Sequence, residues 1–399
     1  MTYDFNLFWR MAYRSFFRWK HTPGRLTRKR LTFILLFYLV WPLGSLFIWL
    51  GLVLDDVLFP GYKNQPVDKP LFILGNFRSG STFLHRLLSR DRDNFTSLTT
   101  FDIYLAPSVT FKKIIQLVAR IDRKIGNPLR RAALAFDKRT LGTVNIHRIS
   151  FFQPEEDENI LMHIWSTYFV SFLFPFMDEL PSYQFFDEAI PEDCKRRIMK
   201  FYRSMLQRHL YATGKKHFVA KNPAFSAKIE TLEQIFPDAR IIYLVRNPLD
   251  MLPSTISWIN YARRVFTDPG EGYLYIDEIL EMTQYWYRHP VAYLDANPSN
   301  RHLILKYDDL IGDPEQIIRR FYRQFDYLIP ITLNKIVRVS IDETLAQQSI
   351  HIYSYEKMGF SREQIVTTYR EIFERFGFDK REYESPQMSD EVRILPALE

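Results

Sequence analysis

A glycine-rich stretch, Gly75 to Thr82 (GNFRSGST), follows a short apolar run and precedes a helical pattern. Gly75 and Gly80 have the spacing of the two glycines in phosphate-binding loops, and Thr82 stands at the Ser/Thr position that follows them. Glycines let backbone N–H groups turn toward an anion, and the N-terminus of the next helix adds partial positive charge. Ser81 occupies the position where enzymes that hydrolyse nucleoside triphosphates need a lysine, and the cation is instead Arg78, inside the loop. The stretch therefore predicts anion binding without ATP or GTP hydrolysis.

A second pair of residues follows another apolar run, Arg240 to Val245. Arg246 comes directly after this run, and Ser254 lies eight residues further on, within a helical pattern. A guanidinium at the end of a strand and a hydroxyl two turns into the next helix can bind one phosphate between them. By itself an Arg after a strand is usually a surface charge, so this pair gains meaning only beside the first loop.

These residues need a scaffold that brings the ends of several apolar runs together. Four such runs alternate with helical patterns and predict β-strands at residues 71–77, 217–221, 240–245 and 302–306. Continuous apolar strands separated by helices indicate an α/β fold, in which a central parallel sheet has helices on both faces as a three-layer α/β/α sandwich. In such a sheet the ligand binds at the carboxyl ends of the strands, where both motifs stand.

Together the motifs resemble the sulfotransferases that use 3′-phosphoadenosine 5′-phosphosulfate (PAPS), in the branch that includes tyrosylprotein sulfotransferases and many bacterial enzymes. Three further stretches match this branch in order: 221–240 (KNPAFSAKIETLEQIFPDAR), 305–322 (LKYDDLIGDPEQIIRRFY) and 349–365 (SIHIYSYEKMGFSREQI). The resemblance covers residues 71–378 and implies a P-loop-like fold with PAPS as co-substrate. It implies that the first loop binds the 5′-phosphosulfate and the second pair the 3′-phosphate. The residues that it assigns to nucleotide binding are Arg78, Ser79, Gly80, Ser81, Thr82, Arg246, Ser254 and Tyr307.

Sulfuryl transfer is expected to pass in line through a loose transition state, so that positioning and charge stabilisation dominate catalysis. We expect Arg78 and Lys221 to lie on the transferring sulfonate, and no metal is then required. An acceptor hydroxyl also benefits from a general base. The resembled branch has a Glu some way after the phosphate loop, and Asp102 stands near that position. We rank Asp102 first as the base, followed by His147 and by Glu156 in an acidic run that could equally be a solvated helix start.

The formal net charge of +7 comes from 53 Lys and Arg against 46 Asp and Glu. Residues 1–30 carry eight basic residues and one acid, so the other 369 residues average to neutrality, which argues against a nucleic-acid partner. A helix over residues 5–20 would carry aromatic side chains on one face and Arg10, Arg14 and Arg18 on the opposite face. Helices that lie among the anionic lipid headgroups of a membrane have this pattern. The alternative is that this helix packs on the protein's own core. Because Cys194 is the only cysteine, no intrachain disulfide can form.

Residues 31–54 form an uncharged apolar segment of 24 residues, long enough to cross a bilayer as a helix. Pro42 and Gly44 divide it into two halves. A single span would place the large domain on the non-cytoplasmic side by the positive-inside rule, whereas a bent hairpin keeps both ends in the cytoplasm. We favour the hairpin and a cytoplasmic catalytic domain, because the nucleotide donor is made in the cytoplasm.

The sequence therefore predicts five segments: a basic interfacial segment (1–30), a membrane segment (31–54), a linker (55–70), a sulfotransferase domain (71–378) and a C-terminal tail (379–399). The leading hypothesis is a membrane-associated, PAPS-dependent sulfotransferase that acts on a hydroxyl of a lipid, a glycan or a protein. A membrane-borne alcohol is attractive because the anchor lies beside the catalytic domain. The alternatives are a P-loop-like phosphotransferase or kinase, and a non-catalytic membrane scaffold that retains the fold.

Overall fold

A parallel β-sheet lies at the centre of the protein. The computed structural model describes residues 3–20, 22–140, 150–215, 217–268, 270, 272–345, 351–378 and 391–394. The sheet has the order β2-β3-β1-β4-β5, and all of its paired neighbours are parallel. The strands are β1 (Leu71–Gly75), β2 (Phe95–Thr96), β3 (His217–Lys221), β4 (Arg240–Val245) and β5 (His302–Lys306). The first predicted strand ends two residues early, at Gly75, because the anion-binding loop begins there.

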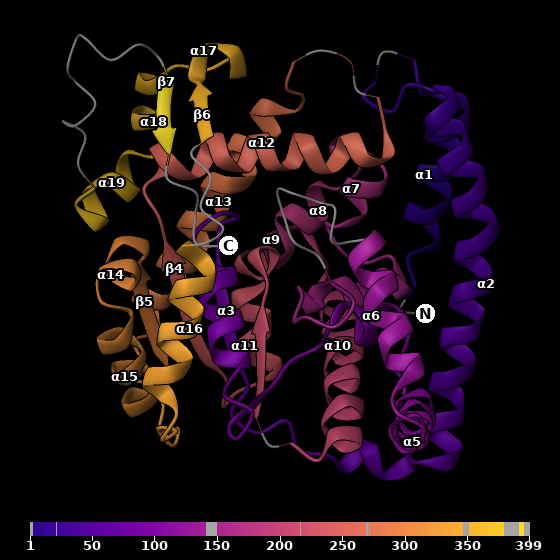
Figure 1. Ribbon diagram of the computed structural model, residues 1–399. Helices are drawn as coiled ribbons and strands as arrows, with labels where there is room; N and C mark the ends of the chain where they lie inside the picture. The colour runs from indigo at the N-terminus through magenta and orange to yellow at the C-terminus, as the bar shows by residue number, and fades with distance from the viewer. Residues whose placement is uncertain are drawn as a thin grey trace.

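Both faces of the sheet are covered, as the unbroken apolar strands predict. Along β1, Leu71 and Ile73 belong to one hydrophobic core, and Phe72 and Leu74 belong to the other. The first core also contains residues of α3 (Ser81–Ser89), α14 (Tyr307–Gly312), α15 (Pro314–Gln324) and α16 (Leu333–Leu345). The second contains residues of α10 (Glu192–Thr213), α11 (Ile229–Ile235), α12 (Pro248–Phe266) and α13 (Ile276–Ala296). The three-layer α/β/α sandwich is confirmed (Figure 1).

Shorter elements complete the domain. Between α3 and α10 lie α4 (Thr100–Tyr104), α5 (Val109–Lys124), α6 (Pro128–Thr140), α7 (Val170–Leu173), α8 (Pro181–Gln184) and α9 (Phe186–Ala189). After α16 come β6 (His351–Ser354), α17 (Tyr355–Met358), α18 (Arg362–Thr368), α19 (Arg370–Phe376) and β7 (Glu391–Ile394). Because β7 pairs antiparallel with β6, part of the predicted tail is attached to the domain.

Two helices precede the sheet, α1 (Phe5–Phe17) and α2 (Arg28–Leu58), and they lie side by side along one edge of the molecule (Figure 1). By length and composition α2 is able to cross a membrane. It runs without a break through Pro42, so the bent hairpin that Pro42 and Gly44 suggested is not formed. The reason is packing on either side of the proline: Trp41 stacks on His163, and Ile48 is buried. The last turns of α2 take up the start of the predicted linker.

Candidate functional site

The loop between β1 and α3 is held in a conformation that requires its glycines. Gly75 has φ +141° and Gly80 has φ +86°. A Cβ atom at Gly75 would come within 2.4 Å of the Leu244 carbonyl oxygen, and one at Gly80 within 2.6 Å of the Tyr307 ring. Helix α3 begins at Ser81, and no side chain in the described residues caps it. The first N–H groups of α3 are therefore left for a ligand, as the motif predicts.

The two anion-binding motifs of the sequence meet in space. The Arg78 Nε atom donates a hydrogen bond to the Ser254 Oγ atom at 2.9 Å. The Arg246 Nη1 atom donates to the carbonyl oxygen of Arg78, also at 2.9 Å. The guanidinium of Arg246 lies 4.4 Å from the centre of the Tyr307 ring. The same ring lies next to Gly80, so it is close to both anion-binding motifs. Two cations and a hydroxyl from separate segments thus converge beside the N-terminus of α3.

The hydroxyl groups of the loop have different surroundings. Ser79 is buried and donates to the carbonyl oxygen of Asn76 at 2.7 Å, which stabilises the turn. Ser81 and Thr82 are the first two residues of α3, where their hydroxyls and backbone N–H groups lie at the positive end of the helix. Ser81 is buried and Thr82 is partly exposed.

A buried ion pair stands at the end of β3, the neighbour of β1. Lys221 is the last residue of β3 and lies opposite Ile73 in the register of the two strands. Its Nζ atom is 2.6 Å from the Oε1 atom of Glu156, and the two side chains are 2% and 10% exposed. The cation and the carboxylate therefore share the sheet edge where the loop and Arg246 lie.

The next two acids of the run that contains Glu156 are also buried. Asp157 accepts hydrogen bonds from the Tyr202 hydroxyl and from the Asn222 Nδ2 atom, the latter at 2.9 Å. Burial raises the pKa of Asp157 to about 7. The two hydrogen bonds lower this pKa, but by less than burial raises it. Glu158 forms an ion pair with Lys228, and neither side chain is exposed. The acidic run is not a solvated helix start.

Asp102 has a structural setting of its own. Its Oδ2 atom accepts from the backbone N–H of Thr99 at 3.0 Å and from the Thr99 hydroxyl at 2.7 Å, which caps α4. Its other oxygen is paired with Lys112. Burial alone would raise the pKa of Asp102, but the charges of Lys112 and His209 and the hydrogen bonds from Lys112 and Thr99 together outweigh it, and the pKa falls to about 2. A carboxylate with so low a pKa is a weak base. His147, the next candidate, lies outside the described residues.

Comparison with known proteins agrees with this geometry. A family model described as the sulfotransferase family matches residues 70–329. The chain belongs to the sulfotransferase family. Two relatives are the omega-hydroxy-beta-dihydromenaquinone-9 sulfotransferases Stf3 of Mycobacterium bovis and Mycobacterium tuberculosis. Each is 25% identical over 350 residues, which covers 83% of this chain and 79% of the relative. Membership of this family favours sulfuryl transfer over the phosphotransferase alternative.

Solved sulfotransferase structures share the fold. STF9 from Mycobacterium avium has a TM-score of 0.68 at 18% identity, covering 95% of this chain and 98% of that structure. STF1 from Mycobacterium tuberculosis has a TM-score of 0.66 at 17% identity, covering 92% and 93%. Since the family model begins only at residue 70, the likeness to STF9 must extend into the segment that precedes it. The likeness to STF9 therefore includes at least part of the N-terminal helical segment.

Sequence reasoning missed His85, which lies one turn into α3. It is buried, and its burial together with the positive charge of Lys221 lowers its pKa to about 3. His85 is therefore neutral at pH 7, and the effect of Lys221 on its pKa shows that it lies near the ion pair between Lys221 and Glu156. Its position four residues after Ser81, on the face of α3 that turns toward the sheet, was the available signal.

Proposed function

We propose that this sulfotransferase transfers the sulfonate group of PAPS to the hydroxyl of a membrane-borne lipid. The observation that carries the proposal is the junction of Arg78, Ser254 and Arg246, because it joins the two anion-binding motifs into one site. A nucleotide with phosphates at both its 3′ and 5′ positions needs two such anion sites at a fixed separation. An ordinary adenine nucleotide would use only the first.

The residues around this junction fit the two ends of the nucleotide. The N-terminus of α3, with the hydroxyls of Ser81 and Thr82, would hold the 5′-phosphosulfate. Arg246 and Ser254 would hold the 3′-phosphate, and the Tyr307 ring keeps the Arg246 guanidinium in place. When bound, PAPS supplies an activated sulfonate; the protein supplies orientation and positive charge.

We assign the general base to Glu156 rather than to Asp102. The Glu156 carboxylate lies beside Lys221 at the sheet edge that carries the anion-binding motifs, where it can accept the proton of an acceptor hydroxyl. Lys221 is placed to stabilise the negative charge that develops on the sulfonate oxygens. Asp102 is instead committed to the cap of α4 and to Lys112, with its pKa near 2.

Two features support a lipid acceptor. The names of the Stf3 relatives give a hydroxylated dihydromenaquinone as their substrate, and this compound is a membrane lipid. In this chain α2 presents an apolar surface beside the catalytic domain. A lipid alcohol would therefore be concentrated where the enzyme is held.

The test begins with nucleotide affinity. Isothermal titration of the purified protein should give much tighter binding of 3′-phosphoadenosine 5′-phosphate (PAP) than of AMP. Equal affinities, or no binding of either, would remove the proposal. Lipid extracts incubated with enzyme and PAPS should then contain sulfonated lipids by mass spectrometry, and extracts incubated with the Lys221→Ala variant should not. Sulfonated products found only among glycans or proteins would overturn the lipid assignment. A scaffold without activity would leave every extract unchanged.

A further inference from the structure

We propose that the protein docks side-on onto an anionic leaflet, with α2 lying in the membrane plane and the helical pair α5–α6 forming the other half of the docking face. This deepens the membrane association of the proposed function and rests on it. It replaces both the single span and the hairpin. The argument starts from how the two ends of α2 are held.

Both ends of α2 are attached to the domain by buried charged side chains. Near its start, Arg30 is fully buried, and its Nη1 atom donates to the carbonyl oxygen of Leu173 at 2.7 Å. Near its end, Asp55 is fully buried and accepts from the backbone N–H groups of Val109 and Thr110 and from the Arg208 Nε atom, at 2.7 to 3.0 Å. These anchors are 25 residues apart, or about 37 Å along a helix.

The middle of α2 is held as well. The Phe37 ring packs edge-on against Phe174 with centroids 5.0 Å apart, and Trp41 stacks on His163. A Cβ atom at Gly51 would come within 2.6 Å of the Phe111 ring, so this glycine permits close approach of α5. A helix that crossed the bilayer would have to give up these contacts and leave buried charges unpaired, which is strongly destabilising. The axis of α2 therefore runs along the domain surface.

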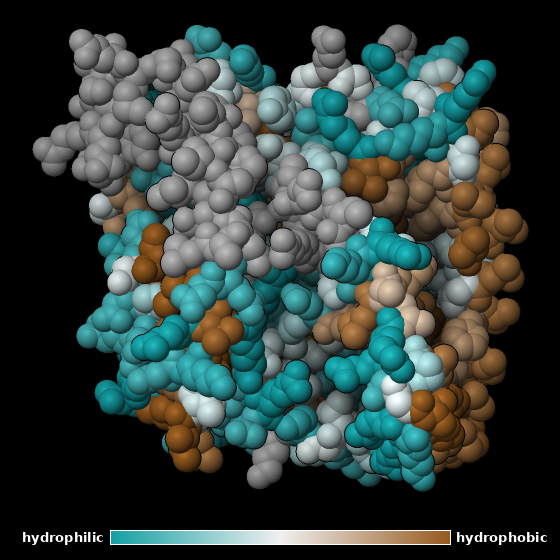
Figure 2. Space-filling view, viewed as in Figure 1, coloured by the Kyte–Doolittle hydropathy of each residue, from teal (hydrophilic) through white to brown (hydrophobic). Residues whose placement is uncertain are grey.

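The outer face of α2 is apolar and exposed over its whole length. Its exposed apolar residues are Leu31, Leu35, Leu36, Leu39, Val40, Leu43, Leu46, Phe47, Leu50, Val53, Val57 and Leu58. Figure 2 shows a largely hydrophobic band along the edge of the molecule that α2 forms. A band of this length is far more than the scattered apolar residues of an ordinary soluble surface, so it needs an apolar partner.

Helix α5 continues this band. The Phe47 ring of α2 stacks on the Phe111 ring of α5 with centroids 4.3 Å apart. From there the exposed apolar residues of α5 recur at helical spacing, and those of α6 follow. They are Ile114, Ile115, Leu117, Val118 and Ile121 in α5, Ile125 directly after it, and Leu129, Leu134 and Phe136 in α6. No residue of α6 is buried. The band therefore extends from α2 onto a second, separate helical element.

Positive charge surrounds the apolar residues of α5–α6. Residues 109–140 contain nine Lys and Arg against two Asp, a net charge of +7. Both acids turn inward: Asp122 accepts from the backbone N–H groups of Leu129 and Arg130, and Asp137 accepts from that of Phe151. Eight of the nine cations are exposed, and the ninth, Lys112, is paired with Asp102. The neutral average of residues 31–399 therefore conceals a second basic cluster.

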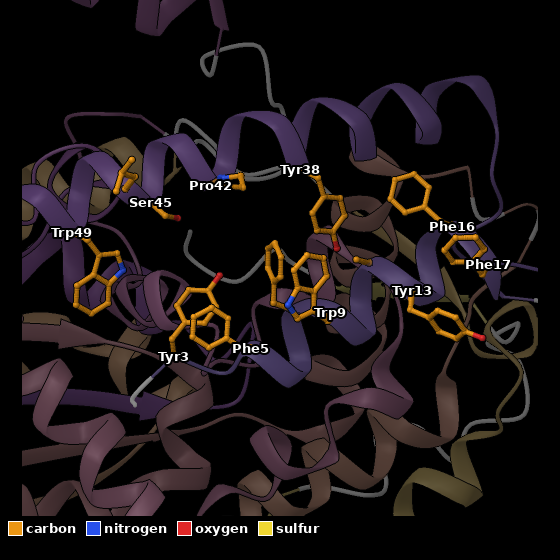
Figure 3. Close-up of a pocket in the computed structure, with 13 residues that line it drawn as sticks. Tyr3, Phe5, Trp9, Tyr13, Phe16, Phe17, Tyr38, Pro42, Ser45 and Trp49 are labelled. Carbon is orange, nitrogen blue, oxygen red and sulfur yellow. The ribbon is translucent and has the colours of Figure 1, made fainter.

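A groove between α1 and α2 opens on the same face. Its volume is about 1200 Å³, and its lining is almost wholly apolar and aromatic, including Phe8, Trp9, Tyr38, Leu46 and Trp49. Leu46 belongs both to the groove and to the exposed band. Figure 3 shows the aromatic side chains of the two helices along the groove. Trp and Tyr are the side chains that favour the membrane interface, and the groove suits the acyl chain of a lipid.

Charge decides between a bilayer and a second copy of the chain as the occupant. A symmetric dimer places the same patch of both copies face to face, which would bring the two +7 clusters together. An anionic leaflet complements the cations, at about 1 kcal/mol for each Lys or Arg near the surface, while its hydrocarbon accepts the apolar band. We therefore assign the face to the bilayer.

The first experiment measures depth. In a Cys194→Ser background, Leu39→Cys on α2, Leu117→Cys on α5 and Leu328→Cys after α15 are each labelled with an environment-sensitive fluorophore. The protein is then added to phosphatidylcholine vesicles with or without phosphatidylglycerol. In-plane docking predicts that the labels at 39 and 117 are both quenched by shallow nitroxide lipids, and that the label at 328 is not. Deep quenching at 39 with none at 117 would overturn the inference in favour of a span.

The second experiment compares matched charge insertions. Leu117→Asp with Ile121→Asp changes two exposed residues of the face. Leu328→Asp with Ile331→Asp changes two exposed residues between α15 and α16, which lie on the opposite side of the molecule from α2 in Figure 1. Cosedimentation with phosphatidylglycerol vesicles should be weakened about tenfold or more by the first pair and hardly by the second. Equal binding by both would overturn the inference, as would a dimer in light scattering that only the first pair dissociates. PAP affinity, measured on the same samples, reports folding and tests the proposed function separately.

Discussion

Replacement of Glu156 by Gln is the most informative single change, because it removes a charge while nearly preserving the shape of the side chain. If Glu156 is the base, the variant loses the group that accepts the proton of the acceptor hydroxyl. It also leaves Lys221 buried beside a neutral amide, since the two side chains are 10% and 2% exposed in the native pair. One substitution therefore has a catalytic and a structural consequence, and the two can be measured apart.

The structural cost follows from the burial of the pair. Removing one charge of a buried ion pair costs about 3–5 kcal/mol, and the lower value is expected here because the amide oxygen can still accept from Lys221. At about 2 °C for each kcal/mol in a large domain, Tm should fall by roughly 6 °C. The catalytic cost of a lost general base is about 10²- to 10⁴-fold in kcat. PAP affinity should remain within about threefold, because Glu156 is not assigned to the nucleotide.

Two further variants make the assay decisive. Asp102→Asn is the matched control, because Asp102 is also a largely buried carboxylate in an ion pair, with Lys112. It should lose stability but keep the kcat of the folded enzyme. Glu156→Gln combined with Lys221→Met removes the unpaired charge, so it should recover much of the lost stability and none of the activity. Tm is read by calorimetry and kcat from transfer of labelled sulfonate at saturating PAPS.

The result that would refute the reasoning is a folded Glu156→Gln variant that retains a large share of its kcat. If Asp102→Asn lost activity at the same time, the general base would be Asp102 despite its low pKa. Loss of kcat in both variants would mean that neither group acts alone.

Three other predictions follow from the site. Arg246→Ala should weaken PAP binding by about 10- to 100-fold and leave AMP binding unchanged in calorimetry, since a charge-assisted contact to the 3′-phosphate is lost; equal losses would contradict the assignment. Gly80→Ala should abolish PAP binding, and adding Tyr307→Ala should not restore it, because the positive φ remains strained. The pKa of Asp157 is raised from 3.8 to about 7, so from about pH 4 to 7 the unfolded chain has released a proton that the folded chain keeps. Stability should therefore fall as pH rises through this window, and Asp157→Asn should flatten that fall in urea unfolding; unchanged slopes would count against it.

The fold and the anion-binding motifs could be predicted from sequence because their signals are local. The strand Leu71–Gly75 is buried on both faces, so every residue in it is apolar and the run is easily recognised. The glycines of the loop are required by backbone geometry within a few residues of each other. The meeting of Arg78 with Ser254 and Arg246 follows from the strand order that such a fold permits.

The ranking of the bases depended on distant contacts. Lys221 stands 65 residues from Glu156, and nothing in the spacing of the acidic run shows which of its carboxylates Lys221 selects. Asp102 had the more suggestive position in the chain, but Thr99 and Lys112 occupy its oxygens. The partners of the two carboxylates are what separate them, and those partners are brought together by tertiary packing.

The membrane segment shows a similar division between local and distant information. An apolar helix of sufficient length is visible in the sequence, but length does not distinguish a helix that crosses a bilayer from one that lies on it. The deciding partners of α2 are Leu173 for Arg30 and Arg208 for Asp55, each more than 140 residues away. The second basic cluster was present in the sequence, but only the structure shows that Asp122 and Asp137 are turned away from its surface.

The three consecutive carboxylates of Glu156, Asp157 and Glu158 each have a different partner: Lys221, then Tyr202 with Asn222, then Lys228. A single inserted or deleted residue before this run would give every carboxylate its neighbour's partner at once. Loops elsewhere in related enzymes can vary in length, but the run should keep its register from one relative to the next. Glu158 and Lys228 should be lost or retained together, so an alignment that shifts the run by one position can be recognised as misplaced.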